Sequence, residues 1–271
     1  MDDENLKESN PGGEFTPRSG DNIEKAFKDY RREGNRAKRY LFVRNICHEK
    51  KVLDYGCGYG FGYLFLNRGC ESYTGIDIDE HAIQWARKYL NRSNSNFYTV
   101  DEYLATSNKV LFDVTISFEV IEHLKDPSGY LDSLNRMTKN GGIIIISTPN
   151  GLWSHGERNL FRTQYHIREY NPEELRELLD PLGWQITFYK ECRRDGLDYR
   201  GFKIMHEGGL NNAAKNHIED LSVRQSLRRQ FLELGWRFGN YPVFWKIVES
   251  KFEEMNSLDY STIVVKIRKP Y

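Results

Sequence analysis

Short apolar runs alternate along the chain with longer segments in which an apolar residue recurs every third or fourth position. Buried parallel strands are nearly continuous apolar runs, whereas the helices that cover them carry one apolar stripe. The alternation therefore predicts an α/β domain with a mostly parallel sheet. The predicted strands are Val52–Asp54, Tyr73–Asp77, Phe97–Val100, Phe112–Ser117, Ile143–Ser147, Gln185–Tyr189 and Thr262–Ile267.

Helical periodicity occupies the segments between these strands. It is clearest in Glu80–Tyr89 and in Pro127–Thr138, where Pro127 fits the first turn of a helix. Another helix is expected to open at Asn171-Pro172, because Asn caps helices well and Pro is tolerated at the first helical position. Residues 23–50 place apolar residues among charged ones at roughly helical spacing and predict N-terminal helices that cover one side of the domain.

The remaining segments define the domain organisation. Residues 1–22 are polar and predict a disordered lead, since they offer too little apolar surface to offset the entropy of ordering. Residues 51–192 form the predicted core and residues 261–271 its last strand. Residues 193–260 separate the last two strands, where a hairpin would need only a few residues, so we expect a helical insertion that caps the domain. The predicted fold is Rossmann-like, with seven mostly parallel strands flanked by helices.

Composition narrows the classes of partner. Among 271 residues, Lys plus Arg and Asp plus Glu each number 39, so no global attraction to nucleic acid or anionic membranes is implied. The longest apolar run, Ile143–Ile146, is too short to span a bilayer, and no signal peptide is evident, so we expect a cytoplasmic protein without a membrane span. Four scattered cysteines indicate neither a disulfide framework nor a zinc site, and the sequence defines no oligomeric state.

A glycine-rich stretch follows the first predicted strand. Gly56, Gly58 and Gly60 would let the backbone turn sharply and approach a ligand that a Cβ would exclude. The dinucleotide fingerprint needs its third glycine at position 61, which is Phe, and this disfavours an NAD-dependent oxidoreductase. The G-x-G-x-G spacing after Asp54 instead resembles motif I of class I methyltransferases that use S-adenosyl-L-methionine (AdoMet). That resemblance implies a loop packed against the amino-acid end of AdoMet.

Acidic residues follow the next two predicted strands. Asp77 lies 21 residues after Gly56, near the roughly twenty typical of nucleoside-binding folds, and is placed to accept ribose hydroxyls. Asp101 resembles the family acid that bonds the adenine amino group. Each acid alone is better explained as a solvated carboxylate or a helix cap, but together with the glycine motif they favour a ligand. The resemblance assigns AdoMet contacts to Asp54, Gly56, Gly58, Gly60, Asp77, Ile78, Asp101 and Phe118.

A second group of polar residues follows the fourth predicted strand. If the segment after Phe118 is helical, Glu119, Glu122 and His123 lie at i, i+3 and i+4 on one face. Two carboxylates and an imidazole suit Mg²⁺ or Mn²⁺, and Zn²⁺ is a further candidate. A helix start that favours carboxylates, with a hydrogen-bonded lining histidine, would explain the same residues without a metal.

Resemblances extend this group to a second histidine. The E-x-x-E-H triplet resembles ubiquinone-pathway O-methyltransferases, and with a histidine before an aromatic residue and a helix it resembles small-RNA 2′-O-methyltransferases. These resemblances imply a divalent cation held by Glu119, Glu122, His123 and His166. A metal would lower the pKa of an acceptor hydroxyl beside a second oxygen. Without a metal, His123 or His166 is the candidate general base.

The predicted activity is methyl transfer from AdoMet to a glycan or small-molecule acceptor. The His166-x-Arg-Glu-Tyr pattern and Arg39-Tyr40-Leu41-Phe42 are similar to methyltransferases encoded with bacterial glycan and O-antigen synthesis. A sugar hydroxyl is therefore the first expected acceptor, a quinone-type phenol the second and an RNA 3′-terminal ribose the third. A nucleic-acid partner would need a basic, aromatic-lined channel, which the sequence does not favour. A non-catalytic AdoMet-binding protein is the alternative class.

Overall fold

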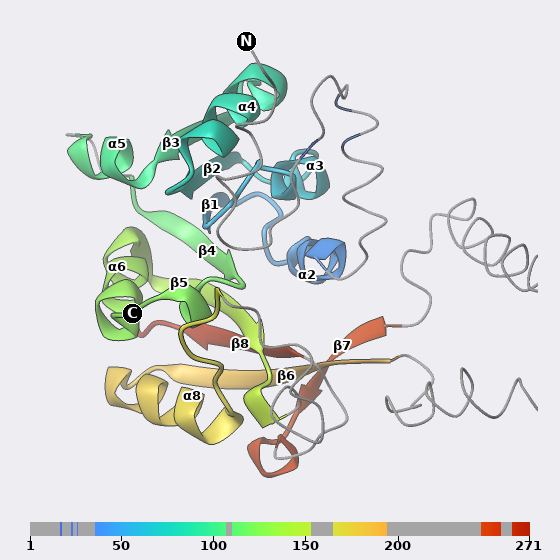
Figure 1. Cartoon of the computed structure of the whole chain (residues 1–271), viewed down its shortest axis with the longest axis vertical. Helices are drawn as coiled ribbons and strands as arrows, with labels where there is room; N and C mark the ends of the chain where they lie inside the picture. The colour runs from blue at the N-terminus through green and yellow to red at the C-terminus, as the bar shows by residue number, and fades with distance from the viewer. Residues whose placement is uncertain are drawn as a thin grey trace, which may run out of the picture.

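The predicted apolar runs form strands of one sheet (Figure 1). The computed structural model describes Pro17, Ile23, Ala26 and residues 36–106, 110–152, 165–193, 245–255 and 262–271. Its strands are β1 (Lys51–Tyr55), β2 (Ser72–Asp77), β3 (Ser95–Thr99), β4 (Phe112–Phe118), β5 (Thr138–Pro149), β6 (Gln185–Arg193), β7 (Trp245–Ser250) and β8 (Thr262–Arg268). Its helices are α2 (Arg36–Val43), α3 (Gly62–Leu66), α4 (Glu80–Leu90), α5 (Val100–Ala105), α6 (Pro127–Met137) and α8 (Pro172–Leu179), with 3-10 turns η2 (Ile121–His123), η3 (Asp180–Leu182) and η5 (Phe252–Glu254).

The strand order is β3-β2-β1-β4-β5-β8-β6-β7. Strands β1 to β5 pair in parallel, whereas β8 is antiparallel to both of its neighbours, β5 and β6. The order reverses between β1 and β4, and open α/β sheets bind ligands at the carboxyl ends of the strands beside such a reversal. The predicted Rossmann-like, mostly parallel sheet is confirmed, with eight described strands rather than seven.

The additional strand, β7, lies in the segment that was predicted to be a helical insertion. Strand β7 pairs antiparallel with β6, with Arg193 opposite Trp245 and Phe188 opposite Ser250. The end of the insertion therefore extends the sheet, and the expectation of a helical segment is wrong for these residues. Residues 194–244 of the insertion lie outside the described residues, as does the predicted disordered lead apart from Pro17.

Alternate residues of the central strands face opposite layers of helices, as the pleat of a strand requires. Ile145 of β5 belongs to an apolar cluster that includes residues of α2, α3 and α4. Ile144 and Ile146 belong to a second cluster, with residues of α6 and α8. Val264 and Val265 of β8 divide between the same two clusters. Burial on both faces explains why these strands are continuous apolar runs in the sequence.

The helices begin at residues that satisfy their free backbone donors. Asp79 caps α4 by accepting hydrogen bonds from the N–H groups of His81 and Ala82. Asn171 caps α8 through a reciprocal capping box with Glu174. Pro127 occupies the first turn of α6, as predicted. These N-terminal caps determine where each helix begins, and hence where the loops at the carboxyl edge of the sheet end.

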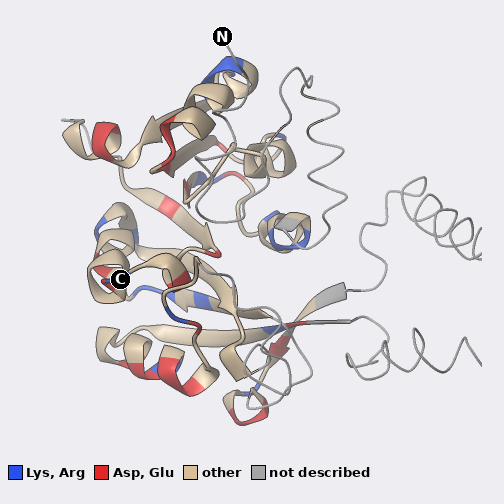
Figure 2. Cartoon of the chain, viewed as in Figure 1, with Lys and Arg blue, Asp and Glu red and all other residues tan. Residues whose placement is uncertain are grey.

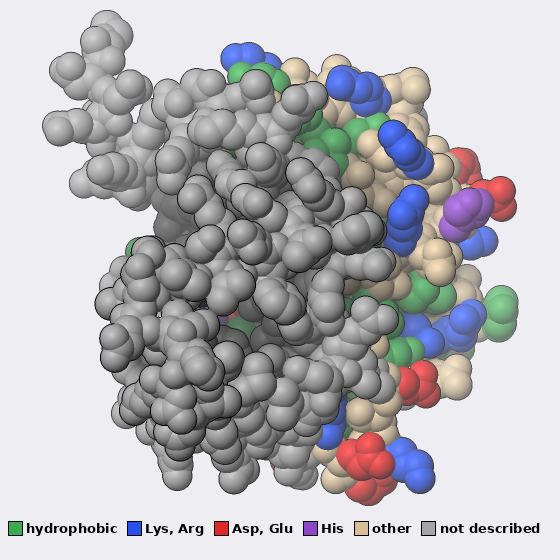
Figure 3. Space-filling view, turned by 90° about the vertical axis from the view of Figure 1, so that its right-hand side faces the viewer, with side chains coloured by type: hydrophobic (Ala, Val, Ile, Leu, Met, Phe, Trp, Pro, Cys, Tyr) green, Lys and Arg blue, Asp and Glu red, His purple; other side chains and the backbone are tan. Residues whose placement is uncertain are grey.

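Charges of both signs are interspersed over the described surface. Figure 2 shows Lys and Arg side chains together with Asp and Glu side chains across the helices, with acidic residues prominent on α8. The described side chains on the face shown in Figure 3 are also mixed. This distribution agrees with the zero net charge of the whole chain. Among the described helices, none has the length and apolar character needed to cross a bilayer.

Candidate active site

The loop after β1 has a backbone that glycine adopts readily and other residues do not. Gly56 and Gly60 have φ angles of 78° and 73°, in the left-handed region where a Cβ is strained. A Cβ on Gly56 would lie 2.4 Å from Cγ2 of Val120, and one on Gly60 would lie 2.6 Å from Cε1 of Phe97. The N–H of Gly56 donates to the carbonyl of Ile76 at 2.8 Å. The loop is thus tied to the end of β2, and Gly56 and Gly60 have no room for a side chain.

Asp77, at the carboxyl end of β2, organises the same loop. Its Oδ2 accepts a hydrogen bond from the N–H of Gly58 at 2.7 Å, and its Oδ1 accepts one from the N–H of Asp79 at 2.9 Å. Burial raises the pKa of Asp77. Each carboxylate oxygen has a second lone pair that can accept a ligand hydroxyl. The neighbouring Ile78 is 82% exposed and presents an apolar surface at the same strand end.

Asp54 lies beneath the loop and is fully buried. Its Oδ2 accepts hydrogen bonds from the hydroxyls of Tyr40, on α2, and Tyr73, on β2. Its Oδ1 is buried and accepts no hydrogen bond from the described residues. Burial raises the pKa of Asp54 to about 7, against the lowering effect of the two tyrosine hydroxyls. The structure therefore places Asp54 as a link between α2 and the sheet under the loop.

Asp101 is not at a strand end, contrary to the prediction. Strand β3 ends at Thr99, which caps α5 together with Glu102, and Asp101 lies exposed in the first turn of that helix. An acidic residue is favourable there because it faces the positive end of the helix dipole. Asp101 still follows the carboxyl end of β3, on the edge of the sheet that carries Asp77 and the glycine loop.

The segment after Phe118 is not a regular helix, which corrects the predicted i, i+3, i+4 arrangement. Glu119 has a φ of 57°, and only Ile121–His123 form a 3-10 turn. The N–H of Glu119 donates to the carbonyl of Ser147 at 3.0 Å, so the backbone stays tied to the end of β5 before it turns. A left-handed glutamate is uncommon, and such strain concentrates at functional sites.

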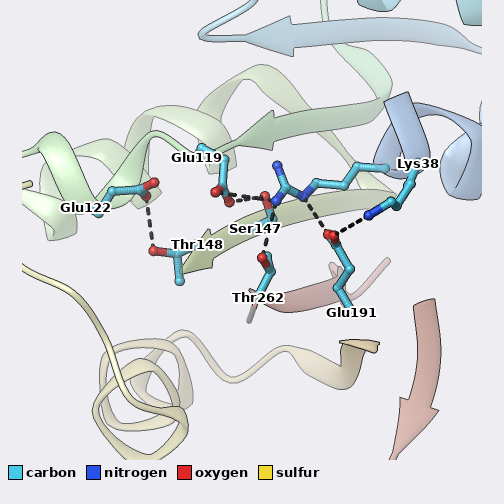
Figure 4. A network of polar contacts seen from close by, with 8 residues as sticks. Lys38, Glu119, Glu122, Ser147, Thr148, Glu191 and Thr262 are labelled. Atoms are coloured by element: carbon cyan, nitrogen blue, oxygen red, sulfur yellow. Dashed lines mark hydrogen bonds and ion pairs between the residues drawn. The ribbon is translucent and has the colours of Figure 1, made fainter. Parts of the chain in front are cut away.

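Three of the four predicted ligands come together. Glu122, His123 and His166 each offer one ligand atom, and these atoms lie within 4.8 Å of one another. Glu119 is not in this group. Its carboxylate accepts a hydrogen bond from Oγ of Ser147 at 2.9 Å and lies 3.4 Å from Nη2 of Arg39 (Figure 4). We name Glu122, His123 and His166 the three-residue cluster.

Glu122 is fully buried, with an oxygen left unsatisfied. Its Oε2 accepts a hydrogen bond from Oγ1 of Thr148 at 3.0 Å, while Oε1 has no hydrogen-bond partner among the described residues. Burial raises the pKa of Glu122 well above its ordinary value, and the negative charge of Glu119 adds to the effect. A buried carboxylate with an unsatisfied oxygen is costly unless a proton or a cation compensates it.

Both histidines are oriented through the same ring nitrogen. Nδ1 of His123 lies 3.0 Å from the carbonyl oxygen of Tyr165, and Nδ1 of His166 lies 2.7 Å from Oε1 of Glu169. Since both partners are acceptors, each Nδ1 carries the proton and donates it, which leaves the Nε2 lone pair available. Burial lowers the pKa of His123, which favours its neutral form.

The donor set fits a divalent cation. Metal-binding histidines commonly donate their other N–H to a carboxylate or a backbone carbonyl, as His166 and His123 do. The N–H groups of Ile167 and Arg168 donate to the carbonyl of Glu122 at 2.9 and 3.1 Å, which ties the segment carrying His166 to the turn carrying His123. Imidazole and carboxylate ligands suit Mn²⁺ and Zn²⁺, and Mg²⁺ accepts the carboxylate.

Several residues that shape the site were not assigned to it from the sequence. Ser147 ends the predicted fifth strand and Thr148 follows it, and their position after a buried apolar run is the one local signal that they reach the carboxyl edge. Glu169 belongs to the quoted His-x-Arg-Glu-Tyr pattern and lies three residues after His166. Arg39 has no local signal for a contact with Glu119, because the two lie 80 residues apart in the sequence.

The family of the chain follows from comparison with known proteins. Residues 21–188 match a family model described as a methyltransferase domain. The match spans more than half of the chain, and the chain belongs to this methyltransferase family. The expected class I AdoMet-dependent methyltransferase domain is confirmed, since the family model is a methyltransferase domain and relatives of the chain are described as S-adenosylmethionine-dependent methyltransferases.

Individual relatives agree with the family. The chain is 31% identical over 147 residues to a probable S-adenosylmethionine-dependent methyltransferase of Mycolicibacterium smegmatis, covering 54% of this chain and 56% of the relative. It is 36% identical over 106 residues to a ubiquinone biosynthesis O-methyltransferase of Nitrosomonas europaea, covering 38% of this chain and 45% of the relative. The chain thus spans about half the length of these curated relatives.

A solved structure supports the fold. A chain of the complex between the Haloferax volcanii Trm112 methyltransferase activator and the putative methyltransferase superposes with a TM-score of 0.57 at 17% identity. The superposition covers 92% of this chain and 93% of that one. At this identity the likeness shows a shared fold, and the chemistry of the site has to be argued from its residues.

Proposed function

We propose that this protein transfers the methyl group of AdoMet to a hydroxyl oxygen of an acceptor that carries a second oxygen beside it. One observation carries the proposal. The glycine loop and the three-residue cluster lie at the same carboxyl edge of the sheet, after β1 and β4, where the strand order reverses. Their common position supports a donor site next to an acceptor-binding group.

The donor side consists of the glycine loop, Asp77 and Ile78. AdoMet, when bound, supplies a methyl group on a positively charged sulfur that an acceptor oxygen can displace. The tight glycine loop presents backbone without side chains at Gly56 and Gly60, which suits a close approach of the amino-acid end of AdoMet. The free lone pairs of Asp77 suit the ribose hydroxyls, and the exposed side chain of Ile78 suits the flat face of adenine. Phe118, at the end of β4, packs edge-on against Tyr40, and we assign it to the donor side because β4 ends next to β1 at the carboxyl edge.

The acceptor side consists of Glu122, His123 and His166. A cation held by these residues would lower the pKa of the acceptor hydroxyl and orient it toward the methyl group. The Nδ1 hydrogen bonds of the histidines fix both rings before the acceptor arrives, which reduces the reorganisation needed for transfer. The alternative mechanism uses the same residues without a metal. In that mechanism His123 or His166 removes the proton of the acceptor hydroxyl through its Nε2.

The acceptor class we favour is a sugar with neighbouring hydroxyls, in glycan biosynthesis. Neighbouring hydroxyls supply the two oxygens, and the similarity around His166 and Arg39 supports this choice. A quinone-type phenol with an adjacent oxygen is the second candidate, and the names of the ubiquinone-pathway relatives support it. We keep an RNA 3′-terminal ribose as the third, although the described surface mixes both signs of charge rather than presenting a basic channel (Figure 2).

A methyl-transfer screen tests the proposal. Purified protein with labelled AdoMet is offered nucleotide sugars, glycans, catechols and RNA, each with Mn²⁺, with Mg²⁺ or with EDTA. We expect label on an oxygen of one acceptor class, lost with EDTA and restored by excess cation. Full turnover in EDTA, abolished only by substitution of a histidine, would assign a general base instead. Binding of AdoMet without turnover on any acceptor would favour the non-catalytic class.

A further inference from the structure

Arg39 and Glu119 form an ion pair at the margin of the three-residue cluster. Nη2 of Arg39 lies 3.4 Å from Oε2 of Glu119, and Oγ of Ser147 donates to Oε1 at 2.9 Å. Both oxygens of Glu119 are therefore engaged outside the cluster. In Figure 4 the carboxylate of Glu119 points toward Ser147, whereas that of Glu122 points toward Thr148.

Arg39 is held firmly on its other sides. Its Nε donates to Oε2 of Glu191 at 3.1 Å, and its Nη2 donates to Oγ1 of Thr262 at 3.3 Å. Glu191, fully buried, also pairs with Nζ of Lys38 at 3.2 Å. Arg39 itself is 3% exposed. Because a guanidinium presents its donors in a rigid fork, contacts with β6 and β8 fix the direction in which it faces Glu119.

We propose that Arg39 withholds Glu119 from the cation, so that three protein ligands, Glu122, His123 and His166, hold the ion and leave it open to two adjacent acceptor oxygens. This inference rests on the proposed function and deepens it. Three protein ligands of a six-coordinate ion leave three neighbouring positions, enough for a chelating acceptor and one water. The substrate class is therefore an acceptor that binds through a hydroxyl and the oxygen next to it.

The distribution of charge agrees with three ligands rather than four. Glu119 is held away from the cluster by its pairing with Arg39 and by the hydroxyl of Ser147, and its carboxylate is not among the clustered ligand atoms. One carboxylate and two neutral imidazoles leave a divalent ion with a net positive charge. A second carboxylate would cancel that charge and weaken its effect on the proton of the acceptor hydroxyl. Arg39 is thus a positioning residue that acts through Glu119.

The first test compares two glutamate variants of the full chain in the presence of AdoMet. Titration calorimetry with Mn²⁺ should show Glu122→Gln losing affinity by at least the roughly 10- to 100-fold that loss of a partner behind a ligand causes. Glu119→Gln should lose less affinity than Glu122→Gln, because it removes a nearby negative charge but no ligand. Equal losses in the two variants would overturn the inference, since both glutamates would then bind the ion.

The second test releases Glu119. In Arg39→Met the affinity for Mn²⁺ should rise roughly tenfold, because cation affinity follows the number and charge of the ligands. The visible absorption bands of bound Co²⁺ should shift in position as the carboxylate of Glu119 replaces a water ligand. Adding Glu119→Gln to Arg39→Met should reverse both changes, which a merely structural role of Arg39 would not produce. A folded Arg39→Met protein with wild-type affinity and spectrum would overturn the inference.

The outcomes separate the two proposals. If wild-type protein binds neither Mn²⁺ nor Co²⁺, the cation of the proposed function and the inference both fall. If it binds them and Glu119→Gln behaves like Glu122→Gln, only the inference falls. Arg39→Met removes one of the two cations that pair with the buried Glu191. If that variant does not fold, the comparison of Glu119→Gln with Glu122→Gln alone tests the inference.

Discussion

A single carboxylate, Asp77, serves two purposes at the donor side. It fixes the N–H of Gly58 and still offers lone pairs to a ligand. Such double use explains why an acid is placed where burial raises its pKa, since a smaller polar group could not reach both the loop and a ribose. Asp113, near the opposite, amino end of β4, pairs instead with Lys139 at 2.6 Å.

Asp77→Ala should therefore weaken AdoMet binding while the matched variant Asp113→Ala does not. Loss of charge-assisted hydrogen bonds should lower the binding free energy by roughly 1.5 to 3 kcal/mol. Calorimetry with AdoMet measures the change, and thermal unfolding without ligand shows that both variants are folded. Equal affinity of wild type and folded Asp77→Ala would contradict the assigned contact.

Glu169 allows the metal to be tested without touching a ligand. Glu169→Ala removes the acceptor behind Nδ1 of His166, so the ring loses its fixed orientation. Affinity for Mn²⁺ should fall roughly 10- to 100-fold, and AdoMet affinity should stay unchanged. Glu177→Ala, on the exposed face of α8, is the control and should bind Mn²⁺ normally. A cation affinity unaffected by Glu169→Ala would remove the support that this hydrogen bond gives to the site.

The position of Glu119 could not be predicted from the sequence around it. The types and order of Glu119, Glu122, His123 and His166 were visible in the sequence, and three of them do meet. Local spacing placed Glu119 with them because it assumed a helix. The backbone is instead set by its hydrogen bond to Ser147 and by Arg39, contacts between distant segments that no local pattern encodes.

Among the elements, α2 joins the parts of the site. Tyr40 bonds Asp54 beneath the glycine loop, and Arg39 bonds Glu119 beside the cluster. Two neighbouring residues of one helix thereby contact both the donor side and the acceptor side. A helix was predicted here from its periodicity, but its docking position was not, since it depends on buried partners in β1, β6 and β8.

Asp54 makes the docking of α2 sensitive to pH. The carboxyl has a pKa of about 7 in the folded protein and its ordinary low value when unfolded. Between those values the folded state binds a proton that the unfolded state does not, so the free energy of unfolding should fall as pH rises toward about 7 and then level off. The slope is at most about 1.4 kcal/mol per pH unit for one group.

Urea unfolding at pH 5, 6, 7 and 8 measures this slope. Asp54→Asn cannot ionise and should lose the part of the fall between pH 5 and 7 that Asp54 causes. Asp113→Asn is the control: the pKa of Asp113 is lowered, chiefly by Lys139 acting against burial, so its titration lies below this range. If wild type and Asp54→Asn show the same slope, Asp54 is already ionised in the folded protein.

Strand prediction succeeded for the core and failed at its margin for a physical reason. Central strands are buried on both faces, so apolar runs such as Ile143–Ile146 mark them clearly. Strand β7 pairs with one neighbour among the described strands, and its six residues mix apolar with charged side chains without a regular period. In such strands the partner rather than the local pattern determines the structure.

For the whole molecule, the pairing of β6 with β7 determines how the insertion is attached. Arg193 and Trp245 are register partners in the two strands, so the two ends that flank residues 194–244 are neighbours in the sheet. The sheet can therefore be closed without them by a short hairpin turn. This arrangement allows acceptor recognition and donor binding to be tested apart.

Replacing residues 194–244 by Asn-Gly should leave a folded protein that binds AdoMet with nearly wild-type affinity. Its turnover on the native acceptor should be lost if the insertion selects the acceptor. Calorimetry and the methyl-transfer assay measure the two properties on the same preparation. Full turnover by the shortened protein would assign acceptor choice to the core, and loss of AdoMet affinity in a folded protein would show that the insertion belongs to the donor site.

The central position of β8 has a consequence for synthesis on the ribosome. This strand is made after the insertion, yet it lies between β5 and β6 and pairs with both. Until Thr262–Arg268 emerge, β5 presents an open edge of isoleucine-rich strand, which is prone to pairing with other chains. Nascent chains that stall within the insertion should consequently depend on chaperones, and a premature stop before Thr262 should give aggregated protein even though the glycine loop and the three-residue cluster are already encoded.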